Sequence, residues 1–348
     1  MTSAPISRPR FRRATGRVTL ADVARIAKVS SQTVSRVLNT PSQVPPATLA
    51  GVRAAIEQAG YVPATAAASL PPQRSKLVAV LVPTLSGTVF TETVEALNKA
   101  LARNGYQMML GESGYHDADE DALLDNLLRR RPDGIVLTRV VKSMAARKRL
   151  SAAGIAVVET WDLTPKPIDM LIGFSHAEVG QAVARHFHAM GRRCPGLIMG
   201  DDPRATRRGD AFVRLVARQH LHTANYPAVP LVRVSAPATV SAGRAGLGEL
   251  LTRCPALDAV FCSTDMVALG VLIEARKRGL RVPQDLAVVG FGDLAFAQST
   301  DPALTTVRVD GTAIGQRAAQ FVMSRAEGWP VAEPVIDMGF LLVRRESA

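Results

Sequence analysis

Aromatic and cysteine residues are scarce in this 348-residue chain. Aromatics make up 5% of it, so its core must be built mainly from Ala, Val, Leu and Ile. The three cysteines, Cys194, Cys254 and Cys262, form no CxxC pair. That argues against a disulfide framework or a zinc site and fits a reducing cytoplasm. We expect all three to be small residues of the core or of loops.

Long apolar runs and enzyme signatures are also missing. No stretch of about 18 apolar residues occurs, so a membrane span is not expected. The basic N-terminus lacks the apolar segment of a secretory signal, which again fits the cytoplasm. The sequence contains no GxSxG elbow, Walker loop or paired metal-ligand motif. We therefore predict a protein that is not an enzyme and that carries no cofactor or metal.

Acidic residues are few at the start of the chain. Residues 1–76 hold eleven Lys or Arg side chains against two acidic ones, a net charge of +9, and the rest of the chain carries +3. A small basic module joined to a nearly neutral larger one indicates a polyanionic partner for the first module. A soluble domain with a charged surface is the alternative.

Composition divides the chain into four parts. Residues 1–16 are rich in Arg, Pro and Ser without periodicity and are predicted to be a disordered basic arm. Residues 17–62 have helical periodicity with short loops, residues 63–74 form an Ala/Pro-rich linker, and residues 75–348 form a larger domain. No internal repeat is apparent in that domain.

The segment 17–62 has the pattern of a helix-turn-helix. Apolar residues at i, i+3, i+4 and i+7 from Leu20 onward predict a first helix with Thr19 as its N-cap, and Lys28 lies in a tight turn. Ser30 can cap a second helix, and a third can run from Pro46 to just before Gly60. The second helix then presents polar side chains suited to base edges and phosphates: Ser31, Gln32, Thr33, Ser35 and Arg36. An ordinary capped helix pair is the alternative.

The run Val29–Asn39 resembles the headpiece of the LacI/GalR family of bacterial transcription repressors. Its pattern is Val-Ser-x-x-Thr-Val-Ser-Arg-Val-Leu-Asn. The resemblance implies that Ser31 and Gln32 read bases in the major groove of operator DNA. It places Arg36 near a base or phosphate, with Thr19 and Asn39 on the DNA backbone. Lys28 stands where the family usually has Gly, and a left-handed backbone there costs a lysine some free energy.

The linker matches the same family. Tyr61-Val62-Pro63 resembles the start of its hinge helix, which implies that Leu70 wedges into the minor groove of a pseudo-palindromic double-stranded operator bound by a homodimer. Ala64 and the Pro71-Pro72 pair depart from the family pattern. A plain Ala/Pro linker is the alternative.

From Leu77 onward, short apolar runs alternate with amphipathic stretches. We predict strands at 77–82, 107–110, 134–137, 155–158, 197–199, 259–262 and 286–289. We predict helices at 92–103, 177–190, 239–251 and 266–278. This alternation predicts an α/β fold with parallel sheets, and the length predicts two such lobes. Ligands of such folds bind at the carboxyl ends of the strands, where two lobes leave a cleft.

The resemblance implies that residues 75–348 look like a two-lobed periplasmic sugar-binding protein. Segments 81–90, 157–162, 172–176, 290–293 and 302–306 resemble the gluconate-utilisation repressors of the family. This implies a sugar-acid effector such as gluconate, a related aldonate or a ketogluconate. A neutral sugar or a phosphorylated sugar acid remains an alternative within the family. A transport protein or a sugar enzyme leaves residues 1–76 unexplained.

A sugar acid needs a guanidinium group for its carboxylate. Three candidates, Arg204, Arg207 and Arg208, follow one another in a predicted loop. The resemblance favours Arg208, four residues before the aromatic Phe212. We expect Arg204 and Arg207 to be solvated.

Other effector-site candidates follow predicted strands. Glu159, Thr264, Asp265 and Asp293 could hydrogen-bond sugar hydroxyls, although Asp265 could instead be a helix N-cap and Asp293 structural. Gly292 replaces the aspartate most common in the family, and the loss of that charge suits an acidic ligand. Phe90, Trp161 and Phe174 could supply apolar faces for the carbon chain or belong to the core.

Overall fold

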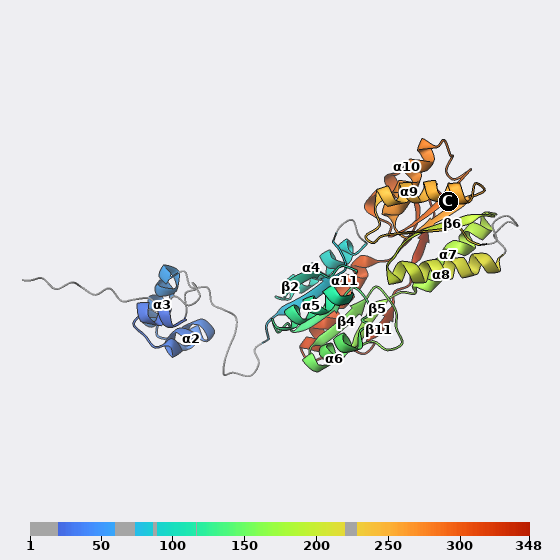
Figure 1. Ribbon diagram of the computed structural model, residues 1–348. Coiled ribbons are helices and arrows are strands. Elements are labelled where there is room, and N and C mark those ends of the chain that lie inside the picture. The colour runs from blue at the N-terminus through green and yellow to red at the C-terminus, as the bar shows by residue number, and fades with distance from the viewer. Residues whose placement is uncertain (1–19, 60–73, 86–88, 116, 220–227) are drawn as a thin grey trace, which may run out of the picture. The chain divides into compact units, whose positions relative to one another are not determined.

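The computed structural model describes residues 20–59, 74–85, 89–115, 117–219 and 228–348 (Figure 1). The side chains of Asn39, Glu57 and residues 117–122 are not part of this description. The chain divides into two compact units, Met1–Gln73 and Arg74–Ala348.

The first unit contains the three predicted helices. They are α1 (Leu20–Ile26), α2 (Ser31–Asn39) and α3 (Pro46–Ala59), with a 3-10 turn η1 (Pro41–Gln43) before α3. Ser30 caps α2 as predicted, because its Oγ accepts a hydrogen bond from the Thr33 backbone N at 3.1 Å. Lys28 has a φ of +53°, which confirms the left-handed turn. Buried Val23, Val34 and Val52 join the three helices into one core.

The second unit contains two six-stranded sheets. In spatial order, the strands of the first sheet are β11 (Val335–Asp337), β5 (Met170–Gly173), β4 (Ala156–Thr160), β3 (Gly134–Leu137), β1 (Leu77–Val82) and β2 (Gln107–Glu112). Those of the second are β12 (Leu341–Val343), β10 (Thr305–Arg308), β9 (Ala287–Phe291), β8 (Ala259–Cys262), β6 (Pro195–Gly200) and β7 (Leu231–Val234). All pairings are parallel except that of β10 with β12.

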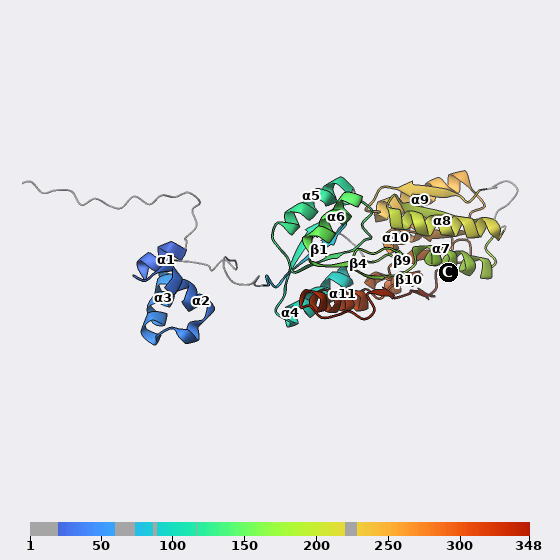
Figure 2. The same cartoon turned by 90° about the horizontal axis from the view of Figure 1, so that it is seen from below.

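Helices cover both faces of each sheet. On the first sheet, α4 (Thr91–Arg103) packs beside α11 (Gly311–Ala326), and α5 (Asp117–Leu128) and α6 (Met144–Ala153) lie on the opposite face (Figure 2). On the second sheet, α7 (His176–Ala189) packs on α8 (Pro203–Arg218), opposite the pair α9 (Val240–Arg253) and α10 (Asp265–Lys277) (Figure 1). The predicted α/β fold with parallel sheets is therefore confirmed.

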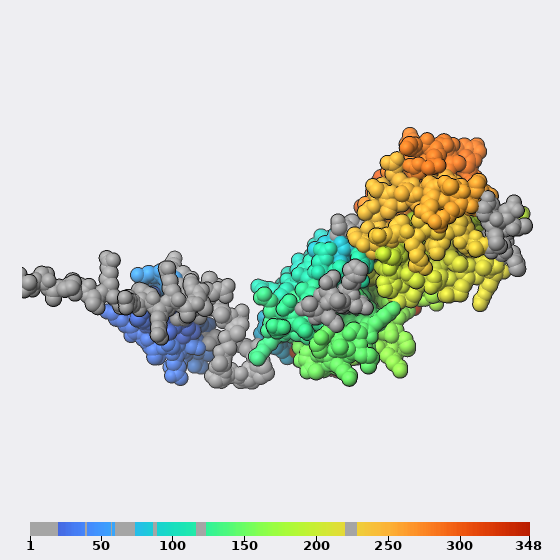
Figure 3. Space-filling view, viewed as in Figure 1, coloured from blue at the N-terminus to red at the C-terminus, as the bar shows by residue number. Residues whose placement is uncertain are grey.

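The chain passes between the two lobes three times: after β5, after β10, and between β11 and β12. Late elements such as α11 therefore complete the first lobe, although they follow most of the second in sequence. The surfaces of the two lobes meet along a common boundary (Figure 3). Strands of both sheets end toward this boundary, where parallel α/β folds place their ligands.

All three cysteines are buried with free thiols, and the Sγ atoms of Cys194 and Cys254 lie 3.0 Å apart. In the described part of the chain, no helix is long and apolar enough to cross a membrane. Within the same residues, no three His, Cys, Asp or Glu side chains gather as metal ligands do.

Candidate effector pocket and DNA-reading helix

A pocket lies where strands of both lobes end. It encloses about 600 Å³ of empty space, part of it open to solvent. Its lining residues are Val89, Phe90, Tyr115, Trp161, His176, Asp202, Arg204, Arg208, Pro237, Ala238, Thr264, Met266, Phe291 and Leu294. Four predicted effector residues are among them: Phe90, Trp161, Arg208 and Thr264.

Helix α8 carries Arg208 into this pocket. Asp202 caps the helix, because its Oδ1 accepts hydrogen bonds from the backbone N of Arg204 and of Ala205. Gly180 on α7 lets α8 approach closely, since a Cβ atom there would lie 2.0 Å from the Arg208 carbonyl oxygen. This helix contact fixes the backbone from which the arginine side chain extends.

Arg208 is 5% exposed, and its hydrogen-bond partners are neutral. Its Nη2 donates to the Ser263 carbonyl oxygen at 3.0 Å, and its Nη1 lies 3.0 Å from His176 Nδ1. The guanidinium carbon lies 3.9 Å from the centre of the Phe291 ring. Within the described part of the chain, the buried Nε has no hydrogen-bond partner. Burial lowers the pKa of Arg208 to about 10, with further lowering by Arg204 and Arg207.

His176 holds Arg208 in place as a neutral imidazole. Its Nε2 lies 2.9 Å from the Trp161 carbonyl oxygen, which can only accept, so Nε2 carries the hydrogen and Nδ1 accepts from Arg208. Burial lowers the pKa of His176 well below its usual value, and the Arg208 charge lowers it further. The ring therefore stays neutral at physiological pH.

The prediction that Arg204 and Arg207 are solvated is wrong for Arg204, whereas Arg207, with a side chain that is 36% exposed, is partly solvated. The side chain of Arg204 is 12% exposed, and its Nη1 donates to the Thr138 carbonyl oxygen at 2.7 Å. The Nη2 of Arg207 forms an ion pair with the carboxylate of Asp162. Thr138 and Asp162 belong to the first lobe, so both arginines bind across the boundary. The sequence places three arginines within five residues but does not show that the opposite lobe faces two of them.

Aromatic side chains form one wall of the pocket. The ring of Trp161 meets Phe90 edge-on at a centroid distance of 5.1 Å and Phe174 at 5.8 Å. Its Nε1 donates to Thr93 Oγ1 at 3.1 Å. Phe174 is fully buried behind Trp161 and does not line the pocket, so it supports the wall as a core residue.

In the first unit, helix α2 presents the predicted reading residues. Ser31, Gln32 and Arg36 are exposed, and Thr33 and Ser35 are half-buried. Thr33 Oγ1 lies 2.9 Å from Ser30 Oγ and so takes part in the cap of the helix. Asn39 ends α2, whereas Thr19 and Leu70 lie outside the described residues.

Comparison with known proteins agrees with both units. Residues 19–64 match the family described as bacterial regulatory proteins, lacI family, and residues 184–348 match the periplasmic binding protein-like domain. The transcriptional regulator GntR of Pseudomonas aeruginosa is 37% identical over 336 residues, 96% of this chain and 97% of that protein. This chain belongs to the LacI family.

Solved structures of LacI-family regulators have the same fold. A regulator from Silicibacter pomeroyi has a TM-score of 0.85 at 31% identity, with 95% of this chain and 99% of that one covered. The regulator GntR from Chromobacterium violaceum has a TM-score of 0.73 at 32% identity, with 78% and 98% covered. As a LacI-family member, the chain is a DNA-binding transcriptional regulator with a small-molecule effector, and not an enzyme.

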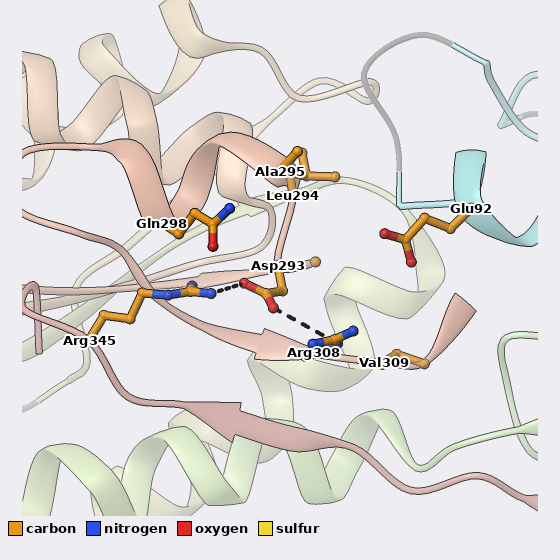
Figure 4. A pocket seen from close by; sticks show the side chains of 9 residues that line it. Glu92, Asp293, Leu294, Ala295, Gln298, Arg308, Val309 and Arg345 are labelled. Atoms are coloured by element: carbon orange, nitrogen blue, oxygen red, sulfur yellow. Dashed lines mark ion pairs between the residues drawn. The ribbon is translucent and has the colours of Figure 1, made fainter. Parts of the chain in front are cut away.

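Gly292, which the family resemblance marks as a replacement for an aspartate, lines a second pocket. Gly292 has a φ of +131°, which side-chain-bearing residues rarely adopt, and a Cβ there would lie 2.6 Å from Val89 Cγ1. The next residue, Asp293, lines the same second pocket (Figure 4) and does not line the effector pocket. There its Oδ1 lies 2.7 Å from Arg345 Nη2 and its Oδ2 4.0 Å from Arg308 Nε. Contact between Asp293 and the effector is therefore not supported.

Glu159 and Asp265 do not line the pocket either. Both are fully buried, and backbone groups occupy their carboxylates. Glu159 accepts from the backbone N of Val141 and of Ile168, each at 2.8 Å. Asp265 accepts from the Leu294 backbone N at 2.7 Å and from Thr306 Oγ1 at 2.5 Å. These carboxylates hold the surrounding loops in place, and their use as sugar ligands is not supported.

The N-cap of α10 is Thr264 and not Asp265. Thr264 Oγ1 accepts from the Val267 backbone N at 3.3 Å. The pocket also includes residues that sequence reasoning had not selected for this role, above all Tyr115, His176 and Phe291. The sequence feature that could have indicated them is a position at the end of a strand, since His176 follows β5 closely and Phe291 ends β9.

Proposed function

We propose that this chain is a repressor whose effector is a singly charged sugar acid, gluconate or a related aldonate or ketogluconate. The observation that carries the proposal is the buried guanidinium of Arg208. Among the described residues its hydrogen-bond partners are an imidazole nitrogen and a carbonyl oxygen, and its Nε has none. A buried charge whose direct hydrogen-bond partners are neutral is costly, and a carboxylate ligand offsets that cost.

The charge of the pocket wall favours a monoanion. Arg204 and Arg208 contribute two positive charges, Asp202 contributes one negative charge, and His176 is neutral. One negative charge on the ligand balances this wall. A neutral sugar leaves a positive charge uncompensated, and a phosphorylated sugar acid brings more negative charge than the wall supplies.

The rest of the lining suits a hydroxylated carbon chain. Trp161 and Phe90 offer apolar faces, while the hydroxyls of Tyr115 and Thr264 can donate to or accept from sugar hydroxyls. Relatives named GntR and the resemblance to gluconate-utilisation repressors support the same ligand class.

For the first unit, we propose the DNA contacts implied by the family resemblance. Exposed Gln32 and Ser31 read base edges, and Arg36 contacts a base or phosphate. Thr33, Ser35, Asn39 and Thr19 bind the DNA backbone, and Leu70 wedges into the minor groove. A homodimer on a pseudo-palindromic operator pairs two such units by symmetry. The site of action is the bacterial cytoplasm, at the nucleoid when the protein is bound to DNA.

An operator titration tests the effector assignment. Full-length protein is added to an operator selected from random DNA, and fluorescence anisotropy gives the affinity with gluconate, 2-ketogluconate, a phosphorylated gluconate or glucose. We expect gluconate or the ketogluconate to weaken operator binding, and glucose to leave it unchanged. Unchanged affinity across all the acids contradicts a sugar-acid inducer.

A further inference from the structure

Arg204 spans the boundary between the two lobes inside the effector pocket. It is the second residue of α8, in the lobe of the second sheet. Its Nη1 donates at 2.7 Å to the carbonyl oxygen of Thr138, just after β3 in the first lobe. Its guanidinium carbon lies 4.8 Å from the centre of the Phe90 ring, also in the first lobe. Arg204 thus ties the lobes through groups that line or border the ligand space.

The charge of Arg204 is poorly compensated. Among the side chains that the structure describes, the nearest carboxylate oxygen is Asp202 Oδ1, which lies 3.9 Å from the Nε of Arg204 and already accepts two backbone hydrogen bonds. The contact at hydrogen-bond distance is a neutral carbonyl oxygen. Positive side chains in the first turns of a helix also oppose the helix dipole. A buried guanidinium in this setting gains more from an anionic oxygen than from the carbonyl oxygen alone.

Arg204 and Arg208 are held in different ways. Arg208 is fixed within its own lobe by Ser263 and His176. The hydrogen bond of Arg204 crosses to the other lobe, so a ligand that takes the Nη1 donor from Thr138 also releases the first lobe. Arg208 is therefore suited to anchor the acid, and Arg204 is suited to couple binding of the acid to the contact between the lobes.

We propose that Arg204 determines specificity and links the ligand to the lobes: it donates to the Thr138 carbonyl oxygen and transfers this donor to an oxygen of the acid when the acid binds. This rests on the proposed sugar-acid function. Arg207 provides a matched control, because it also crosses to the first lobe, by its ion pair with Asp162, yet does not line the pocket.

The test uses full-length R204Q, R207Q and wild type. Without ligand, hydrogen–deuterium exchange followed by mass spectrometry reports on each cross-lobe contact. We expect R204Q to speed exchange in residues 139–142, and R207Q to speed it in residues 162–165 instead. With gluconate, calorimetry should show at least tenfold weaker binding by R204Q and less than threefold change in R207Q. If R204Q does not fold, R204K decides the same question, because lysine keeps the charge but lacks the guanidinium fork.

Two results overturn the proposal: gluconate binding by R204Q equal to that of wild type, or unchanged exchange in residues 139–142 of ligand-free R204Q. The proposed function fails separately, when wild type itself binds none of the sugar acids. In that case the exchange measurement still decides whether Arg204 ties the lobes.

Discussion

His176 Nδ1 accepts a hydrogen bond from Arg208 Nη1 across 3.0 Å, while His176 Nε2 donates to the Trp161 carbonyl oxygen across 2.9 Å. One neutral ring thus joins the proposed carboxylate anchor to the aromatic wall of the pocket. Trp161 lies just beyond β4 of the first lobe, and His176 begins α7 of the second. The ring that helps to hold the anchor within its own lobe therefore also contacts the first lobe.

Replacing Arg208 should uncouple the two functions of the protein. We expect R208A to keep its operator affinity and to lose about 2 kcal/mol of gluconate binding, roughly thirtyfold, because it removes charge-assisted hydrogen bonds. Calorimetry with gluconate and an operator titration measure the two effects. R214A, an exposed position on the same helix, is the control and should behave as wild type. A normal effector response in R208A moves the carboxylate site elsewhere.

The neutral state of His176 predicts a pH dependence of stability. Its pKa in the folded protein lies well below the usual value, so below about pH 6.5 the unfolded chain binds the proton more readily. The contribution to stability is full above that pH and falls as the pH drops. Between pH 7 and 5, wild type should lose stability that H176Q does not lose, by at most about 2 kcal/mol, because glutamine can donate and accept without a charge. Urea unfolding at both pH values measures this difference, and parallel losses in the two proteins contradict it.

Asp265 should change the stability of the protein with pH in the opposite direction to His176. Burial raises its pKa to about 6, so as the pH falls from 7 to 5 the folded protein gains a proton before the unfolded chain does. Its contribution to stability is present at low pH and is lost as the pH rises through 6. We expect wild type to gain about 1 kcal/mol relative to D265N between pH 7 and 5. A stability difference between the two proteins that is the same at both pH values contradicts the raised pKa.

The sequence was enough to predict the elements with strong local signals. The three helices of the first unit, the cap at Ser30 and seven apolar strands follow from periodicity and capping chemistry. Strands β5, β7, β10, β11 and β12 were not among the predicted runs. They are three or four residues long, and β11 and β12 are edge strands that keep exposed residues such as Leu341. Such short segments acquire strand structure through their neighbours.

The site was harder to predict than the fold. The family resemblance selects Arg208, and in the structure Arg208 lines the pocket. Glu159 and Asp265 follow strands as ligand residues do, but only the folded chain shows that backbone N–H groups occupy their oxygens. Arg204 was missed because its partner Thr138 lies 66 residues away in sequence. Contacts across the lobe boundary carry no local sequence pattern.

Gly180 allows the helix contact that positions Arg208, so its substitution should be costly. In G180A the new Cβ meets backbone, the Arg208 carbonyl oxygen at 2.0 Å, which cannot move without shifting α8. We expect a loss of about 1–3 kcal/mol of stability together with weaker effector binding. G248A on α9 is the control: its Cβ meets only the flexible end of Arg278, so we expect little change or a small gain. Equal effects in the two variants contradict the role assigned to Gly180.

Gln32 is the side chain best suited to read a base, because its amide can both donate to and accept from adenine. It is exposed on α2, one residue after the helix begins. We expect Q32A to weaken binding to the selected operator by about 1–3 kcal/mol and to leave binding to random DNA almost unchanged. Q58A, at an exposed position on α3, is the control and should change neither. Anisotropy titrations on both DNAs at one salt concentration make the comparison, because phosphate attraction depends on salt. Equal weakening on operator and random DNA assigns Gln32 to the DNA backbone instead.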